Sequence, residues 1–257
     1  MSYKGFDLEG RVAVVVGGTS GIGQTIGRGL AEAGADVIST GRRAELVDAA
    51  AQEIEAFGRR TLRICSDVLD RSSLQMLLDA AVAEFGKVDI LVNAAGRTKR
   101  TPFLEVEDKE WNDILDTNLN GAYRACQVFG RHMVGRKYGR IINIASLTSF
   151  LGMHEVAAYA ASKSGLAGLT RTLAIEWARY GVCVNAIAPG VFRTALNDKL
   201  LDGPRGQELL LRTPMKRFGK VEELIGSAIF LASEAASFVT GTILMVDGGF
   251  LSSGVNQ

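Results

Sequence analysis

Short apolar runs alternate with longer stretches of helical periodicity along the whole chain. The runs with strand character are Arg11–Val16, Asp36–Thr40, Thr61–Cys65, Ile90–Asn93, Arg140–Ala145, Cys183–Ala188 and Thr242–Val246. Continuous apolar runs of this length, bounded by glycine or polar residues, are typical of strands that are buried on both faces of a parallel sheet. The pattern therefore predicts a parallel sheet that forms the centre of the protein.

The segments between these runs have the spacing of amphipathic helices. They are Ile22–Ala33, Ala44–Phe57, Ser72–Phe85, Glu107–Gly135, Ala157–Tyr180 and Glu222–Ala232. Alternation of strand and helix indicates right-handed βαβ units, with helices on both faces of the sheet. The segment 195–219 breaks this rhythm with charged residues, Pro204 and Pro214. It predicts a helical excursion that serves as a substrate lid.

Composition narrows the class of protein. The chain has 257 residues, 47% of them hydrophobic and 22% charged, which predicts a single α/β domain over residues 1–257 with a sizeable core. A net charge of +1 supplies no field for polyanions, so nucleic-acid binding is not expected. Three separated cysteines and two histidines make a poor metal set and indicate a reducing cytoplasm. We expect neither a membrane span nor a signal peptide.

A glycine-rich turn follows the first predicted strand and opens a helix. It reads Gly17-Gly18-Thr19-Ser20-Gly21-Ile22-Gly23. Glycines let the backbone approach a pyrophosphate, and the helix N-terminus offers free N–H groups with partial positive charge. The turn predicts a dinucleotide site, and its alternative interpretation is an ordinary tight βα turn.

The end of the second predicted strand bears on which dinucleotide binds. This strand ends Ser39-Thr40-Gly41-Arg42-Arg43, without the carboxylate that accepts the adenosine ribose hydroxyls of NAD. The Arg42 guanidinium can instead form a forked contact with a 2′-phosphate. NADP(H) is therefore favoured and NAD(H) is the alternative, unless Arg42 and Arg43 only begin a solvated helix.

Three polar residues form a candidate catalytic group. Tyr159 and Lys163 are four residues apart in a predicted helix, so they lie on the same face. A cation beside a phenol stabilises the phenolate, which moves its pKa from about 10 toward neutrality and allows proton exchange with an alcohol or carbonyl oxygen. Ser146 ends the strand before them, at the sheet edge where α/β sites assemble, and its hydroxyl can orient the same oxygen.

Taken together, these motifs resemble the short-chain dehydrogenase/reductase family over essentially the whole chain. The matching residues, in the family's order and approximate spacing, are Gly17-xxx-Gly21-Ile22-Gly23, Asp67-Val68, Asn93-Ala94-Ala95-Gly96, Asn118, Ser146, Tyr159-xxx-Lys163, Pro189-Gly190 and Thr194. The resemblance implies an α/β fold of the Rossmann type, with three layers and a doubly wound parallel sheet of seven strands. It also implies a Ser-Tyr-Lys-Asn active site and no metal.

The resemblance assigns a role to each catalytic residue. Tyr159 would be the general acid/base, and Ser146 would polarise the substrate oxygen. Lys163 would bind the nicotinamide ribose and lower the pKa of Tyr159. Asn118 would hold a water that relays protons through Lys163; Asn120 is its competitor for this role, but the family's Asn-x-x-Gly placement selects Asn118.

The same resemblance implies the cofactor contacts. Asp67 and Val68 would contact adenine, Asn93 the adjoining ribose, and Phe192 with Thr194 the nicotinamide carboxamide. Further contacts are implied for Gly17, Thr19, Ser20, Gly21, Ile22, Gly23, Ala94, Ala95, Gly96, Pro189 and Gly190.

The substrate signal lies after Gly96, in the stretch from Arg97 through Lys99 and Arg100 to Phe103. Together with the later Glu110-Trp111-Asn112-Asp113, it is similar to that of gluconate 5-dehydrogenases and deoxy-ketogluconate dehydrogenases. This likeness implies a sugar-acid substrate whose carboxylate meets Arg97 and Arg100; the alternative is an exposed charged loop without a role.

The loop between Ser146 and Tyr159 is expected to form one side of the substrate pocket. The hydrophobic residues expected in that wall are Leu147, Phe150, Met153 and Val156. In the same loop, His154 could hydrogen-bond a substrate hydroxyl.

The leading functional hypothesis is an NADP-preferring oxidoreductase that interconverts a secondary alcohol and a ketone of a small molecule. A 3-oxoacyl thioester reductase is the alternative within the enzyme class. A dinucleotide-binding scaffold without turnover is the alternative from another class. The resemblance further implies a homotetramer that is assembled through the helices Glu107–Gly135 and Ala157–Tyr180.

Overall fold

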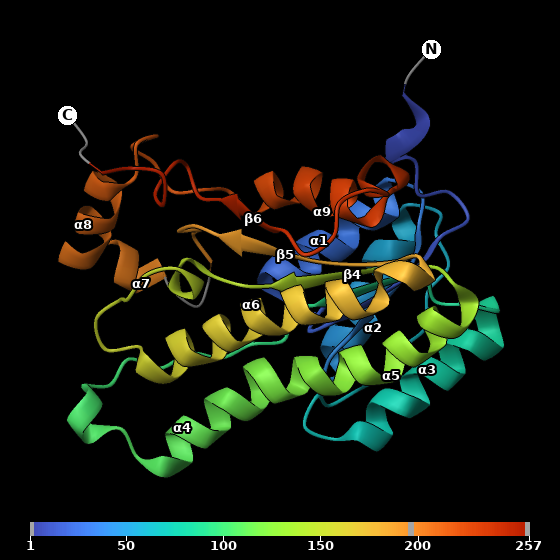
Figure 1. The fold of residues 1–257 in the computed structure, drawn as a ribbon, viewed down its shortest axis with the longest axis horizontal. Helices are drawn as coiled ribbons and strands as arrows, with labels where there is room; N and C mark the ends of the chain where they lie inside the picture. Colours follow the sequence, from blue (N-terminus) through green and yellow to red (C-terminus); the bar gives the residue numbers. More distant parts are fainter. Residues whose placement is uncertain (1–2, 195–197, 255–257) are drawn as a thin grey trace.

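A computed structural model describes residues 3–194 and 198–254, and these residues build a parallel sheet with helices on both faces (Figure 1). Within this part of the chain the sheet has six strands in the order β2-β1-β3-β4-β5-β6. Their bounds are β1 Val12–Val16, β2 Asp36–Thr40, β3 Ile90–Asn93, β4 Gly139–Ile144, β5 Val182–Pro189 and β6 Ile243–Val246. The predicted three-layer α/β class is confirmed.

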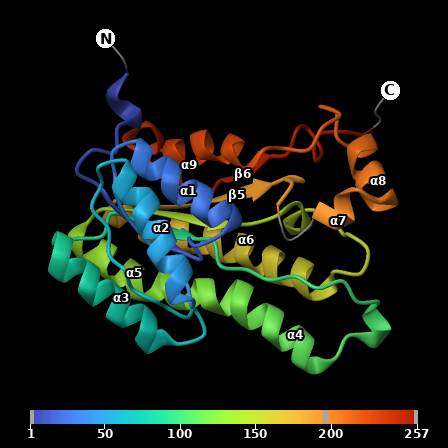
Figure 2. The same ribbon diagram turned by 180° about the vertical axis from the view of Figure 1, so that it is seen from behind.

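The helices cover the sheet in two layers. Their bounds are α1 Gly21–Glu32, α2 Ala44–Ala56, α3 Arg71–Phe85, α4 Asp108–Leu115, α5 Gly121–Arg136, α6 Ala157–Trp177, α7 Asp198–Leu201, α8 Pro204–Arg212 and α9 Ile225–Ala232. Helices α1 and α9 lie on one face, and α3, α5 and α6 lie on the other, while α2 lies beside α1 (Figures 1 and 2).

The alternation of side chains along β1 shows how the two layers share the sheet. Ala13 and Val15 pack in the cluster that includes residues of α1 and α9, whereas Val14 and Val16 pack against α3 and α5. Because successive strand residues point to opposite faces, an entirely apolar strand buries both of its faces. This explains the continuous apolar runs of the sequence.

The predicted strand Thr61–Cys65 is not a strand in the structure, so the described sheet has six strands rather than seven. The segment does run beside β2, where Val37 N donates to Arg60 O at 3.1 Å. Next to this bond, side chains of β2 rather than its backbone form the hydrogen bonds to the segment. The Asp36 carboxylate accepts from Arg60 N, and the Thr40 hydroxyl donates to Ile64 O. A regular backbone ladder is therefore interrupted.

The strand register brings several loops to one edge of the sheet. Val16 lies opposite both Thr40 and Asn93, and Asn93 lies opposite Asn143. The glycine turn after β1, the residues after β2 and the loop after β3 therefore leave the sheet at the same level. This is the carboxyl edge, where α/β proteins assemble their sites.

Two regions depart from simple helices. The predicted helix Glu107–Gly135 is divided into α4 and α5 by a π-helical turn at Asp116–Asn120, whose last bond runs from Gly121 N to Asp116 O. The predicted excursion 195–219 contains α7 and α8, and its residues 195–197 lie outside the described part of the chain. Glycine is required where α7 meets α8, because a Cβ on Gly206 would lie 1.8 Å from the Leu201 carbonyl oxygen.

Candidate active site

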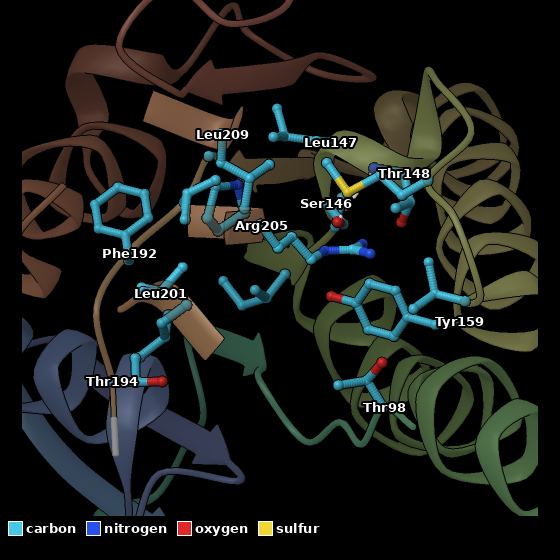
Figure 3. Close-up of a pocket in the computed structure, with 18 residues that line it drawn as sticks. Thr98, Ser146, Leu147, Thr148, Tyr159, Phe192, Thr194, Leu201, Arg205 and Leu209 are labelled. Atoms are coloured by element: carbon cyan, nitrogen blue, oxygen red, sulfur yellow. Dashed lines mark hydrogen bonds between the residues drawn. The ribbon is translucent and has the colours of Figure 1, made fainter. Parts of the chain in front are cut away.

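A cavity of about 260 Å³ opens at the carboxyl edge of the sheet (Figure 3). Its walls come from the loops after β4 and β5, from the start of α6, and from α7 and α8. Ser146 and Tyr159 line it together, as the sequence predicts. The structure thus brings the candidate catalytic hydroxyls to one concave surface.

The side chains of Ser146 and Tyr159 are joined by a hydrogen bond in this cavity. Ser146 caps the 3-10 turn Leu147–Ser149, where its Oγ accepts from Thr148 N at 3.2 Å. Burial raises the pKa of Tyr159 above its ordinary value, and a hydrogen bond with the Ser146 side chain opposes this rise. The sequence predicts a lowered pKa for Tyr159, and the structure shows the opposite direction. Desolvation of the phenolate outweighs the hydrogen bond with Ser146.

Lys163 follows Tyr159 by one helical turn and is almost completely buried, with 4% of its surface exposed. Its Nζ donates to Ile144 O at 2.7 Å and lies 5.6 Å from the centroid of the Tyr159 ring. Burial lowers the pKa of Lys163 to about 8. The ammonium is therefore held next to the phenol at a considerable desolvation cost.

Asn118 connects the loop after β3 with α6. Its Oδ1 accepts from Arg97 N at 2.8 Å, and its Nδ2 donates to Arg97 O at 2.9 Å and to Ser162 Oγ at 3.1 Å. A Cβ on Gly96 would lie 3.6 Å from Asn118 Oδ1 and 3.7 Å from Lys163 Nζ, so both groups face the same small space. Sequence reasoning missed Ser162, because a serine inside a helix carries no distinguishing signal.

The glycine turn has a backbone that other residues would block. Gly17 has φ +80°, and a Cβ on it would lie 2.5 Å from Ala95 N; a Cβ on Gly23 would lie 2.2 Å from Gly17 O. Ser20 begins α1 without a side-chain cap, and Gly21 has open space around its Cβ position. The N–H groups of α1 are therefore accessible to a phosphate, and the turn fits a dinucleotide pyrophosphate.

The end of β2 lies directly against this turn. Gly17 N and Gly18 N both donate to Thr40 O at 3.0 Å, and a Cβ on Gly41 would lie 2.7 Å from Thr19 Oγ1. Arg42 is exposed next to this contact, and within residues 3–194 and 198–254 it has neither a hydrogen bond nor an ion pair. Its guanidinium is therefore available to an anionic ligand beside the glycine turn.

The predicted adenine region has mixed features. Val68 is buried close to α5, since a Cβ on Gly121 would lie 2.9 Å from the Val68 side chain. The Asn93 side chain points into the protein, where Nδ2 donates to Asn143 Oδ1 at 2.8 Å and to Cys126 Sγ at 3.3 Å. Asn93 can therefore reach a cofactor ribose only through its main chain, because its amide is engaged beneath the sheet edge.

The strand β5 ends in the other predicted cofactor contacts. Pro189, Gly190, Phe192 and Thr194 all line the cavity. Gly190 must be glycine, because a Cβ there would lie 2.5 Å from Asp247 Cα. The structure places these residues together, opposite Tyr159.

The predicted substrate cations do not line the cavity. Arg97 is paired with Asp113 at 3.3 Å, Arg100 is paired with Glu155, and the His154 side chain is 79% exposed. Ion pairing and exposure direct these three side chains elsewhere, so the structure does not bring them to Ser146 and Tyr159.

Other wall residues differ in outcome. Leu147, Met153 and Val156 line the cavity as expected, whereas Phe150 is 49% exposed and does not. Thr98 and Arg205 line the cavity and were missed by sequence reasoning. Arg205 lies near the start of α8, where an arginine in the sequence indicates a solvent-exposed position rather than a cavity wall.

Metal-binding and membrane-spanning features bear on the class of site. Within the described ranges, no cluster of three or more His, Cys, Asp or Glu side chains could hold a metal ion. Over the same part of the chain, no helix has the length and apolar character needed to span a bilayer.

Comparisons with known proteins cover nearly the whole chain. The profile of a family described as enoyl-(acyl carrier protein) reductase matches residues 16–251. The chain is 41% identical to gluconate 5-dehydrogenase of Gluconobacter oxydans, over 96% of this chain and 97% of that protein. It is 42% identical to 2-dehydro-3-deoxy-D-gluconate 5-dehydrogenase of Escherichia coli, over 98% and 100% of the two chains.

The structure is similar to solved structures of related proteins. One is a gluconate 5-dehydrogenase from Burkholderia cenocepacia in complex with NADP and tartrate, with a TM-score of 0.94 and 40% identity over 98% of this chain and 99% of that one. Another is a putative 2-deoxy-D-gluconate 3-dehydrogenase from Agrobacterium tumefaciens with bound NADP, with a TM-score of 0.90 and 40% identity over 98% and 100% of the two chains.

Proposed function

Because the chain belongs to the short-chain dehydrogenase/reductase family, we propose that it is an NADP-dependent oxidoreductase that interconverts the secondary alcohol and the ketone of a sugar acid. The observation that carries this proposal is the meeting of Ser146 and Tyr159 in one cavity, with the buried Lys163 Nζ 5.6 Å from the centroid of the Tyr159 ring. The glycine turn after β1 leaves the sheet at the same edge.

The catalytic residues act on the substrate oxygen. The bound cofactor supplies the hydride acceptor in oxidation and the hydride donor in reduction. In reduction the Tyr159 phenol gives its proton to the carbonyl oxygen and becomes a phenolate, and in oxidation the Tyr159 phenolate takes the proton of the substrate hydroxyl. Ser146 donates a hydrogen bond to the same oxygen. The Lys163 ammonium stabilises the phenolate, and Asn118 positions the loop beside Lys163 and holds the relay water.

The proposed cofactor-binding residues include the glycine turn after β1, whose backbone N–H groups are accessible, and the exposed Arg42. The glycine turn would hold the pyrophosphate, and Arg42 would pair with the 2′-phosphate. Related proteins of known structure contain NADP, which supports NADP(H) over NAD(H) for this chain. Asp67 and Val68 are proposed for adenine, the Asn93 main chain for the ribose, and Phe192 with Thr194 for the carboxamide.

The names of the relatives support the substrate class. Gluconate 5-dehydrogenase and 2-dehydro-3-deoxy-D-gluconate 5-dehydrogenase both act on polyhydroxy acids, and the Burkholderia cenocepacia protein holds tartrate, a hydroxy dicarboxylate. The family profile that matches the chain is described as enoyl-(acyl carrier protein) reductase, so an acyl thioester is the second candidate substrate class.

Assembly and lid movement are further parts of this proposal. We propose that the protein is cytoplasmic, supported by its three unbridged cysteines. We also propose a homotetramer, supported by the exposed apolar side chains of Tyr123 on α5 and Ile175 on α6, which are 42% and 82% exposed. A molar mass of one chain, measured by light scattering, would contradict the homotetramer.

We also propose that residues 195–219 form a lid. Ion pairs of Arg193 with Asp198 and Asp202 hold the start of this segment.

The experiment that tests the function follows nicotinamide absorbance with purified protein. NADP(H) and NAD(H) are run in parallel against gluconate, ketogluconates, neutral polyols and 3-oxoacyl thioesters. We expect turnover of a sugar acid with NADP(H) preferred. Turnover confined to thioesters would favour the second candidate, and the absence of hydride transfer from all substrates would favour a dinucleotide-binding scaffold.

A further inference from the structure

Arg205 is a cation in the cavity wall, and among the residues that the structure describes it has no acidic partner. It lies on α8, is half-buried, and extends toward the wall that carries Ser146 and Tyr159 (Figure 3). Within the described ranges its guanidinium hydrogen-bonds only to His154 O, through two long contacts of 3.4 Å. No carboxylate of residues 3–194 or 198–254 forms an ion pair with it.

The neighbouring charges leave an excess of positive charge. Glu155, whose negative charge acts on Arg205, is bonded to Arg100. Glu208 on α8 is paired with Arg212 at 3.3 Å. Burial lowers the pKa of Arg205, with Arg100 adding repulsion and with Glu155 and Glu208 opposing both. A half-buried guanidinium with no anion is costly, and an anionic ligand would remove this cost.

The fold fixes Arg205 in this position. Pro204 opens α8, and close contact between Gly206 and the Leu201 carbonyl oxygen sets α8 against α7. Leu201 and Leu209 then line the cavity on either side of Arg205 in the sequence. Arg205 also lies in the first turn of α8, where the helix dipole adds positive potential.

We infer that Arg205 binds the carboxylate of the substrate and that it determines the preference for acids over neutral polyols. This inference rests on the proposed function and assigns its carboxylate contact to α8 rather than to Arg97 or Arg100. The carboxylate would be held from the lid side, while Ser146 and Tyr159 hold the reacting oxygen from the opposite wall.

The test compares the variants Arg205→Gln and Arg205→Lys with the wild type on D-gluconate, or on the sugar acid with the highest turnover. Loss of a charge-assisted contact that is present in both ground and transition states raises KM and leaves kcat nearly constant. We expect a KM about ten- to a hundred-fold higher for Arg205→Gln and partial recovery for Arg205→Lys. Arg212→Gln, on the exposed end of the same helix, is the matched control and should retain the wild-type KM.

Neutral substrate distinguishes charge recognition from a general defect of the lid. D-glucitol, which has a hydroxymethyl group in place of the carboxylate, is tested as substrate or as competitor, and its affinity should change far less than that of gluconate. NADPH binding by fluorescence verifies that each variant is folded. Equal losses for both compounds, or an unchanged KM for gluconate, would overturn the inference. If the wild type turns over only neutral compounds, the proposed sugar-acid function itself fails.

Discussion

Replacing Lys163 with methionine should stabilise the protein at neutral pH and abolish turnover. The ammonium is 4% exposed, and burial lowers its pKa from 10.5 to about 8. This difference lowers the free energy of unfolding by about 3 kcal/mol below pH 8, because the charged side chain is less stable in the folded protein than in the unfolded chain. Methionine has a similar length and no charge, so it avoids this cost.

The gain is reduced by one lost hydrogen bond. Lys163 Nζ donates to Ile144 O at 2.7 Å, and an unpaired buried carbonyl costs about 1–2 kcal/mol. The net stabilisation at pH 7 is therefore about 1–2 kcal/mol. Its pH dependence is the sharper signature. Between pH 8 and 10.5 the unfolded chain binds more protons at Lys163 than the folded protein does, so wild-type stability rises with pH across this window.

The assay is urea unfolding at fixed protein concentration between pH 7 and pH 10. The advantage of Lys163→Met over the wild type should shrink by roughly 2–3 kcal/mol over this range. Lys109→Met, which changes a lysine that is 81% exposed, is the control and should show no such trend. A stability difference between Lys163→Met and the wild type that stays constant with pH would refute a desolvated ammonium at this site.

Three other changes test separate parts of the structure. Arg42→Ala should raise the KM for NADPH at least ten-fold and leave that for NADH nearly unchanged, because only NADPH carries the 2′-phosphate; equal effects on both would contradict the assignment. Gly23→Ala should abolish NADPH binding measured by fluorescence, because its Cβ would lie 2.2 Å from Gly17 O, and retained affinity would contradict the close packing of the turn. His132 Nε2 accepts a hydrogen bond from Val88 N. The pKa of His132 is lowered below 6.5, mainly by burial and further by the charge of Arg136. The stability contributed by neutral His132 is therefore lost as pH falls below 6.5 toward the folded-state pKa, and urea midpoints should fall less for His132→Gln than for the wild type; parallel losses would argue against this role.

The parts of the fold that follow from short-range periodicity could be predicted from the sequence. Apolar strands and amphipathic helices encode which faces are buried, and parallel strands bring their carboxyl ends to one edge. Ser146 and Tyr159 meet for that reason. The segment Thr61–Cys65 has the composition of a strand, but the Asp36 and Thr40 side chains interrupt its pairing with β2. Such competition depends on contacts between distant segments.

The site residues that could not be predicted depend on tertiary placement. Arg205 lies on α8, and its direction is set by the meeting of α7 with α8 at Gly206, which the spacing within α8 does not encode. The Asn93 side chain turns inward because Asn143 lies opposite it on the next strand. The pKa of Tyr159 rises because of burial, and the spacing of four residues to Lys163 contains no information about burial.

The contact between Gly41 and Thr19 restricts how cofactor preference can change in evolution or by design. An acidic residue that recruits NAD would have to enter at the end of β2, yet position 41 admits no side chain without displacing Thr19 from the phosphate turn. Position 42 is exposed and free of partners among residues 3–194 and 198–254. If Arg42 binds the ribose phosphate as proposed, selection can change nucleotide preference at position 42 while the glycine turn stays intact, so this preference can diverge independently of the catalytic chemistry.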